Sequence, residues 1–387
     1  MPYFNYTLHS LDPREASYWQ RREFVHAWWA IGREDDRWTP PPYVWLQREL
    51  DPRRNDHLAR LPAALIHVDA LHRTGVRRSR TDQQEIPLTS IFERPLAAAV
   101  AAIDPRRKGR TAHLSLLHLA QDDEAFDRLY YHLVETLSAE NYHRVVGPVG
   151  LSPHLGSGVL ADSWNAWPPR HTPANPPYVP ELVGRRLRVL QTGRLYHASV
   201  PTAAGALPPS TVAPVAVAPF DSARLAGDLL PLLAVATDNP TAGFPPPDAA
   251  EAAFLLRQIG PGAFGGLAER DGAPAGFVLL APDDAGRLRA ARGGRPLWGR
   301  AWLGLTRGRP ARAGRLLFGA VASEARQQGI GRTLWAWALA EARARGWETL
   351  TVGPVWEPRE GQSAAAAFLE AAGAAPRQTY QLYEWSF

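Results

Sequence analysis

The chain has 387 residues, 45% of them apolar and 21% charged, which is typical of a globular protein with more than one core, so two domains are expected. It contains no cysteine, which excludes disulfides, thiolate metal sites and cysteine nucleophiles. Its formal net charge is +5, and all of its basic residues except one lysine are arginines. These arginines are interspersed with acidic residues along the chain, and such a mixed surface argues against nucleic-acid binding.

Neither a membrane span nor a secretory signal is expected. No apolar run approaches the ~18 residues that a spanning helix needs. The first ten residues, MPYFNYTLHS, lack a basic segment followed by an apolar one. We therefore expect a cytoplasmic protein with no membrane partner.

The first half offers an apolar helix and a histidine-containing strand. Trp28 and Trp29 fall in the helix, where core packing is the expected role of their rings. His113 and His118 lie on the strand 113–120 but are an odd number of residues apart, so they face opposite sides and are not expected to share an ion. No metal site is predicted.

A proline-rich segment, residues 156–182, follows later in this half. It contains six prolines and two tryptophans, which restrict its backbone without forming a regular ladder. The sequence leaves open whether this ordered excursion is a lid or only a packing loop.

The chain divides near residue 200, where residues 200–219 carry no charge and are rich in proline and alanine. The two sides end alike, because VGPV at 146–149 recurs at 352–355 and QTGRLYHAS at 191–199 resembles QTYQLYEWS at 378–386. We therefore predict two duplicated domains, residues 1–200 and 213–387, joined by a Pro/Ala-rich linker at 201–212.

The second half is expected to combine strands and helices in a mixed α/β order. The strands are predicted at 215–217, 265–269, 276–280, 316–321, 349–352 and 379–385, and the helices at 222–235, 249–258, 332–345 and 363–372.

One turn of this half has the pattern of an anion site. It reads Arg326-Gln-Gln-Gly329-Ile-Gly331 and stands before a helix whose apolar residues recur every three or four positions. Backbone N–H groups at a helix N-terminus have no partner within the helix, and glycine lets a ligand approach them, so a phosphate or pyrophosphate is expected. The turn matches neither a P-loop nor the glycine fingerprint of dinucleotide-binding proteins. The alternative interpretation is that the glycines only form a tight connection and bind no ligand.

The segment LLFGAVASEARQQGIGRTLWAWALAEARARGWETLTVGPV (316–355) resembles the acetyl-CoA-binding core of the GNAT N-acetyltransferase superfamily. FLEAAGA and the closing YQLYEW extend this resemblance, and in the first half DDRWTPP, VVGPVGLSP, GVLADSW and NPPYVPEL resemble a tandem group of bacterial GNAT-like proteins. The resemblance implies an α/β (α+β) fold of two tandem GNAT-like domains, each with a mixed, mostly antiparallel central sheet flanked by helices.

The resemblance also implies a cofactor, acetyl-CoA, and the residues that bind it. Backbone N–H groups of the turn would hold the pyrophosphate, Arg326 would stiffen the loop and offset phosphate charge, and a main-chain N–H of the preceding strand would polarise the thioester carbonyl. The residues implied are Gly319, Ala320, Val321, Arg326, Gln327, Gln328, Gly329, Ile330, Gly331, Arg332 and Thr333. In the first half Gln121 precedes three acids, which would repel phosphates, so that domain is expected to be degenerate.

The proton chemistry of the second half must proceed without histidine, because the last histidine is His197. Glu357, just after VGPV, is the first candidate base and Glu384 the second, although either can be a structural carboxylate. At the position of the family's thiolate-protonating tyrosine this chain has Leu369. Tyr380 or Tyr383 on the last strand, or water, is left to supply that proton.

The favoured function is acetyl transfer from acetyl-CoA to a primary amine carried by a small molecule or peptide. The alternatives are a catalytically weak acyl-CoA-binding or interaction protein, and an acyltransferase that uses a longer acyl or aminoacyl donor. The sequence leaves open the acceptor, the acyl-chain length and the oligomeric state.

Overall fold

The computed structural model describes residues 5–73, 76–78, 85–87, 91–107, 109–202, 216–219, 229–239, 241–260 and 262–387. The first half contains β1 (Asn5–Leu11), α1 (Tyr18–Gly32), α2 (Tyr43–Glu49), α3 (Asp56–Ala59), β2 (Ala63–Arg73), β3 (Val76–Arg78), β4 (Glu85–Pro87), β5 (Ile91–Ala102), β6 (Thr111–Leu119), α4 (Asp123–Ala139), β7 (Arg144–Val149), β8 (Val159–Leu160), α5 (Tyr178–Gly184) and β9 (Arg188–Ser199).

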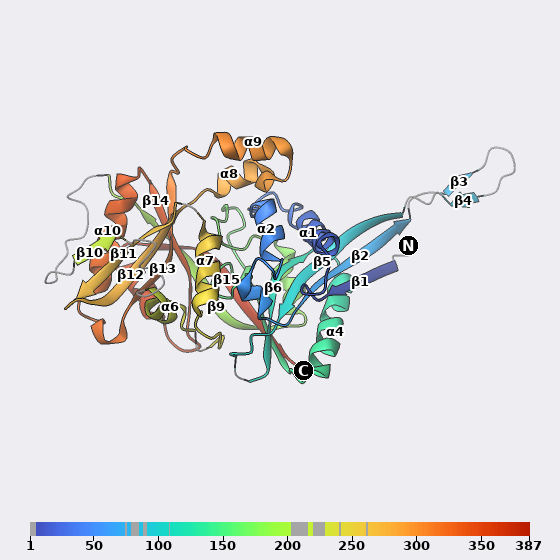
Figure 1. Ribbon diagram of the computed structural model, residues 1–387, viewed down its shortest axis with the longest axis horizontal. Helices are drawn as coiled ribbons and strands as arrows, with labels where there is room; N and C mark the ends of the chain where they lie inside the picture. The colour runs from blue at the N-terminus through green and yellow to red at the C-terminus, as the bar shows by residue number, and fades with distance from the viewer. Residues whose placement is uncertain are drawn as a thin grey trace.

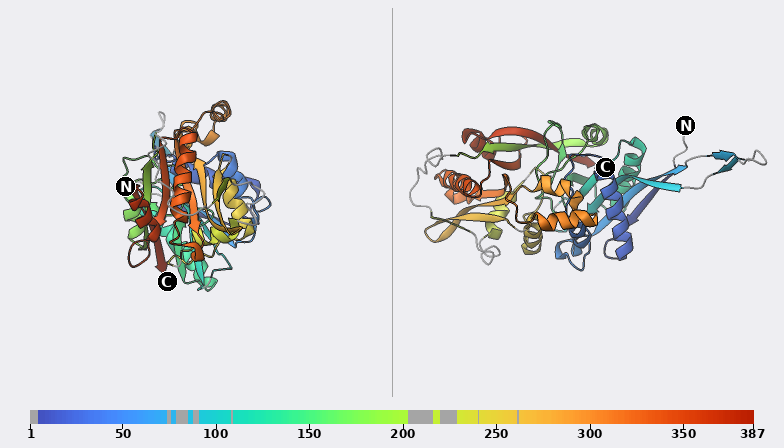
Figure 2. Two further views of the ribbon diagram at one scale, coloured as in Figure 1. Left: turned by 90° about the vertical axis from the view of Figure 1, so that its left-hand side faces the viewer. Right: turned by 90° about the horizontal axis from the view of Figure 1, so that it is seen from above.

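The second half contains β10 (Ala216–Pro219), α6 (Leu229–Thr237), α7 (Ala249–Ile259), β11 (Phe264–Arg270), β12 (Ala273–Pro282), α8 (Ala285–Ala290), the 3-10 turn η2 (Arg292–Gly294), α9 (Leu297–Leu305), β13 (Ala313–Val321), the 3-10 turn η3 (Ser323–Ala325), α10 (Ile330–Ala344), β14 (Thr349–Trp356), α11 (Ala364–Ala371) and β15 (Ala375–Ser386). The predicted strands and helices of this half are present, with shifted ends. The predicted linker 201–212 falls largely outside the described residues, as do Val215 and residues 222–228 of the first predicted helix. The sequence did not predict α8 and α9, which lie together near the middle of the molecule (Figures 1 and 2).

One continuous, mostly antiparallel sheet runs the length of the molecule (Figure 1). Its strand order is β1-β2-β5-β6-β7-β15-β9-β14-β13-β12-β11-β10, and β8 pairs with β15. Within the described residues, only β6 with β7 and β13 with β14 pair in parallel. The two parallel pairs occupy equivalent places in the two halves, which agrees with the duplication predicted from the repeated VGPV of β7 and β14.

The last strands of the two halves are exchanged. β15, at the end of the second half, pairs with β7 of the first, while β9, at the end of the first half, pairs with β14 of the second. The exchange extends into the cores: Tyr383 and Trp385 pack among first-half residues, and Tyr196 and Ala198 pack among second-half residues. Each half therefore completes the sheet and the core of the other.

Helices cover both faces of the sheet, and some of them begin at side-chain caps. α1 opens with a capping box, in which Ser17 Oγ accepts from the Gln20 N–H and the Gln20 side chain accepts from the Ser17 N–H. In α7 the Asp248 carboxylate accepts from the N–H groups of Ala250 and Glu251. Among the described residues, no helix is both long and apolar enough to cross a membrane.

Candidate functional site

The two central strands of the second half part at a defined point. β13 and β14 are paired from Ala313 with Thr349 to Leu316 with Val352, and the pairing ends there. β14 remains paired with β9, with an irregular register between Val352 and Val355, while β13 remains paired with β12. Beyond Leu316 and Val352 the two strands are no longer paired with each other, and this unpaired stretch defines the opening of the sheet.

Backbone groups of β13 face this opening. The N–H of Ala322 donates to Ala275 O, on the side of β12. Since successive N–H groups of a strand point to alternate sides, those of Gly319 and Val321 point away from β12, toward the side that β14 has left. Gly319 is exposed, and Ala320 and Val321 are half-buried. The structure thus places two donors of the predicted set at the parting.

The turn after β13 exposes a row of backbone donors. Gln327 (φ 62°) and Gly329 (φ 81°) both have left-handed backbone, and Gly329 is the N-cap of α10 without any side-chain cap. Among the hydrogen bonds of the described residues, none is donated by the backbone N–H of Gln327, Gln328 or Gly329. Together with the first N–H groups of α10, they form an uncapped helix N-terminus suited to an anion.

The space around the turn also suits a ligand. A Cβ built on Gly331 would approach only Val321, at 3.8 Å, so the missing side chain leaves a hollow beside the end of β13. Ile330 is buried and anchors the start of α10, while Arg332 is exposed. This hollow and the free N–H groups fit the pyrophosphate of a coenzyme A thioester.

Side chains of the turn and of the first turn of α10 form hydrogen bonds to nearby backbone carbonyl groups. Arg326 Nε donates to Val321 O at 3.4 Å, and Gln328 Nε2 donates to Glu324 O at 3.0 Å. The Thr333 hydroxyl donates back to Gly329 O at 3.4 Å. The Arg326 guanidinium therefore links the turn to the last residue of β13 while remaining exposed to solvent.

The corresponding turn of the first half is closed. α4 is capped by Asp122, whose carboxylate accepts from the Ala125 N–H at 2.8 Å and from the Tyr6 hydroxyl at 3.2 Å. Asp123 and Glu124 fill the first turn of the same helix. A carboxylate thus occupies the N-terminus of α4, at the place where α10 has no side-chain cap.

Glu357 lies directly beyond β14, at the far edge of the opening. Its N–H donates to Thr192 O, and its carbonyl accepts from the Gln191 side chain at 2.5 Å. Its carboxylate is half-buried and paired with Arg194 of β9, Nη1 to Oε1 3.1 Å. The exchanged strand of the first half therefore positions this candidate base.

The other proton-transfer candidates are buried. Tyr383 packs in the first-half core, where its hydroxyl donates to Gln381 at 2.7 Å and burial raises its pKa to about 12. The buried Glu384 is surrounded by arginines and binds Arg144 and Arg188. Tyr380 is fully buried, which raises its pKa to about 12, and its hydroxyl lies near Thr172 and Arg315. The structure brings Glu357 and the turn into one half and places Tyr383 and Glu384 in the other.

Arg315, which was not predicted from the sequence, connects β13 to β14 at the point where their pairing has ended. It is fully buried on β13, and its guanidinium donates to Gly353 O at the divergence and to Arg170 O of the proline-rich segment. Burial lowers its pKa to about 10. An arginine within the apolar run AGRLLFGAV was the available signal.

The proline-rich segment binds firmly to the second half. Arg170 donates from its backbone N–H to Asp283 at 3.1 Å and from Nη1 to Asp284 at 2.9 Å. These two bonds tie Arg170 of the segment to the residues that follow β12.

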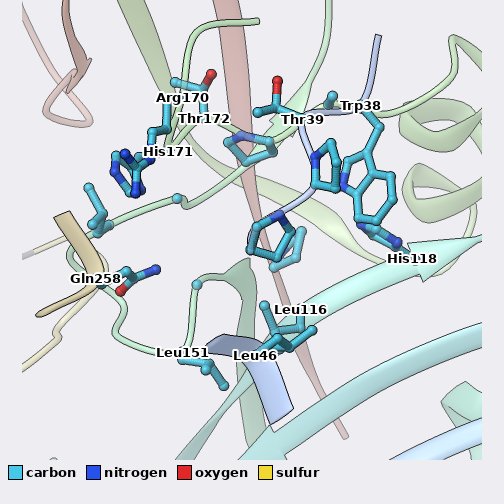
Figure 3. Close-up of a pocket in the computed structure, with 18 of the residues that line it drawn as sticks. Trp38, Thr39, Leu46, Leu116, His118, Leu151, Arg170, His171, Thr172 and Gln258 are labelled. Atoms are coloured by element: carbon cyan, nitrogen blue, oxygen red, sulfur yellow. The ribbon is translucent and has the colours of Figure 1, made fainter. Parts of the chain in front are cut away.

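A cavity of about 250 Å³ lies between the two halves, where β6 and β7 part (Figure 3). Trp38 and His118 line one end, and His171 and Gln258 line the other. His118 donates from Nδ1 to Trp28 O and stacks on the Trp28 ring, and burial lowers its pKa to about 4. No residue of 319–333 lines this cavity, which is therefore separate from the turn.

Comparisons with known proteins give a family match within the second half and a shared fold for the whole chain. Residues 232–374 match the model of the acetyltransferase (GNAT) family. A tandem GNAT protein from the clavulanic acid biosynthesis pathway superposes with a TM-score of 0.56 at 14% identity, over 99% of this chain and 98% of that one. A conserved protein of unknown function from Enterococcus faecalis V583, described as a probable N-acyltransferase, gives 0.54 at 6% identity, over 99% and 73%. No curated protein sequence matches the chain.

Proposed function

Since residues 232–374 match the acetyltransferase (GNAT) family and the chain shares the fold of a tandem GNAT protein, we propose that its second half transfers an acetyl group from acetyl-CoA to a primary amine. The fold supports acyl-CoA-dependent N-acyltransferase chemistry in general. The observation that carries the proposal is the uncapped N-terminus of α10, which stands at the end of β13 beside the parting from β14.

Binding rests on the backbone of the turn. The N–H groups from Gln327 to Arg332 hold the pyrophosphate, with the Thr333 hydroxyl at the next turn of the helix. Arg326 offsets phosphate charge. The hollow left by Gly331 lets the phosphates approach the backbone closely.

The reacting carbonyl belongs at the end of β13. When bound, acetyl-CoA supplies an acyl thioester that an amine can attack directly. The N–H groups of Gly319 and Val321 donate to its carbonyl oxygen and stabilise the negative charge that develops there. The Ala320 backbone, between them, keeps this end of β13 paired with β12.

Two proton transfers complete the exchange. As the amine nitrogen bonds to the acyl carbon and the carbon–sulfur bond breaks, Glu357, directly or through water, takes the proton that the nitrogen loses. The leaving thiolate takes a proton from water or from a tyrosine of β15. Tyr380 is the nearer of the two tyrosines, because it lies beside Arg315, which contacts Gly353 at the parting.

The first test is calorimetric titration of acetyl-CoA into the wild type and Gly331→Glu. We expect binding to weaken by at least about 100-fold in the variant, since a carboxylate would stand in the phosphate hollow. The helical backbone of Gly331 accepts a side chain, and an acid in the first turn of a helix is favourable, so the variant should fold. Gly286→Glu, at a position with nothing within 4 Å of a Cβ, is the matched control. Equal affinity in all three proteins would refute the site.

A second test separates an enzyme from an acyl-CoA-binding protein without turnover. The Arg194–Glu357 pair favours this alternative, because an ion pair already engages the carboxylate that the proposal uses as its base. The protein contributes no thiol, so coenzyme A release can be followed with a thiol reagent without a protein background. With an amine panel, we expect Glu357→Gln to lower kcat about 100-fold while acetyl-CoA affinity stays unchanged. Binding without turnover on any amine would favour the alternative.

A further inference from the structure

Two histidines and an aspartate meet on the edge of the sheet farthest from the second half. His9 of β1 lies directly opposite His67 of β2 in the strand register, and Asp69 follows two residues after His67 on the same face. β1 is the edge strand beside β2, with α1 nearby (Figure 1). Residues separated by 58 positions in the sequence thus form one cluster, the His9–His67–Asp69 cluster.

The three side chains converge on one point. The Nε2 atoms of His9 and His67 lie 3.5 and 3.4 Å from the same oxygen, Asp69 Oδ2. Their potential ligand atoms all lie within 4.8 Å of one another. Ligands of a tetrahedral zinc ion, bound at 2.0–2.2 Å, are separated from one another by about 3.3 Å. Two of the three separations therefore already fit a shared ion.

His67 is a buried histidine, only 1% exposed, whose ring nitrogens form no hydrogen bond among the described residues. Its ring lies between His9, stacked at 4.5 Å, and Phe24 of α1, at 6.4 Å edge-on. A buried polar group without a hydrogen bond is costly and usually signals a missing partner, such as an ion. Asp69 is also buried and, within the described residues, pairs only with these histidines.

From this geometry we propose that the His9–His67–Asp69 cluster binds one Zn²⁺ through both Nε2 atoms and an Asp69 oxygen, with water as the remaining ligand. Imidazole and carboxylate are ligands that zinc prefers. The two rings are nearly parallel, at 12°, so the His9 ring turns to direct its nitrogen at the ion. The His9 side chain is 34% exposed on the edge strand, which leaves room for this rotation.

The ion would have a structural role. Among the described strands β1 pairs with β2 alone, and α1 covers the same face of the sheet as the cluster. A metal bound by one residue of β1 and two of β2 would hold the edge strand in register, because binding to the folded state alone stabilises that state. The site lies in the first half, apart from the turn of the second.

The test is zinc binding to the full chain, prepared without an affinity tag that binds metals. We expect one equivalent of zinc by elemental analysis, a higher Tm with zinc, and reversal by a chelator. Titration should show affinity reduced by at least about 100-fold in both His9→Gln and Asp69→Asn, because losing even an outer-shell partner costs up to that much. His26→Gln, at an exposed histidine of α1 outside the cluster, should bind as the wild type does.

Two results would overturn the proposal. One is a folded wild type that takes up no zinc from a large excess. The other is zinc binding that persists undiminished in His9→Gln and Asp69→Asn, which would place the ion elsewhere. His9 is partly exposed and on an edge strand, so its variant should fold even if changes at the buried residues do not.

Discussion

The helices α4 and α10 follow equivalent strands yet begin in opposite ways. α4 is capped by Asp122 and has two further acids in its first turn, whereas α10 begins at a left-handed glycine with no side-chain cap. A side-chain cap is worth about 1 kcal/mol to a helix. The first half has that stability at the place where the second half leaves the start of its helix without a side-chain cap. The two helices therefore differ both in local stability and in the backbone groups that they expose.

The hydrophobic cores do not differ in this way, because each of them contains residues from both halves of the chain. Trp385 of β15 is 4% exposed within the first-half core. Trp385→Ala should therefore destabilise the first half, by about 3–5 kcal/mol, although the residue belongs to the second half of the chain. Chemical denaturation followed by fluorescence measures this loss. Trp298→Ala, at a ring 55% exposed on α9, should change stability by less than about 0.5 kcal/mol. Equal losses in the two variants would contradict the exchanged-strand description.

Mild acid should lower the folding stability of the first half in particular, since all twelve histidines lie in that half. Burial lowers the pKa of His118 from 6.5 to about 4. The unfolded chain therefore binds the additional proton between these values, so this stability is complete above pH 6.5 and is lost as the pH falls toward 4. The slope is about 1.4 kcal/mol per pH unit for each such histidine.

Denaturant titrations at pH 7, 6 and 5 measure that slope, and His118→Gln should reduce it. The buried His113, whose pKa is lowered to about 3, contributes in the same direction and remains in the variant. The assignment to His118 fails if the variant and the wild type lose stability equally over this range.

The smallest expected effect comes from the cap itself. Asp122→Ala removes the acceptor of the Ala125 N–H and the Tyr6 hydroxyl, at a cost of about 1 kcal/mol. It should leave acetyl-CoA affinity unchanged, because the proposed phosphate site lies at α10. Thermal melting and calorimetry on one preparation provide both values. A changed affinity would mean that the first half takes part in cofactor binding.

Much of the second half was predictable from local patterns. The glycines of the turn, the apolar face of α10 and the alternation of β11 and β12 are short-range signals, and the elements lie where these signals indicated. The segment with α8 and α9 gave no such signal, because it is rich in glycine and arginine and α9 leaves Leu297 and Leu305 exposed.

The arrangement of the site depended on contacts between distant residues. Nothing near Glu357 in the sequence indicates its pairing with Arg194, and nothing near Tyr383 indicates that β15 pairs with β7 of the first half. Arg315 and the His9–His67–Asp69 cluster likewise depend on strand register and tertiary packing. Sequence periodicity assigns a residue to an element, but the topology decides which elements become neighbours.

The exchange of β9 and β15 determines how the protein should respond to cleavage of the chain between its two halves. A chain broken between its halves would yield two fragments, each holding a strand that the other requires in its sheet. Such fragments should remain associated after a nick and should be recovered together when co-expressed, while each alone would present an unpaired strand edge prone to aggregation. The single chain therefore has the architecture of an interlocked dimer whose two subunits have been made continuous.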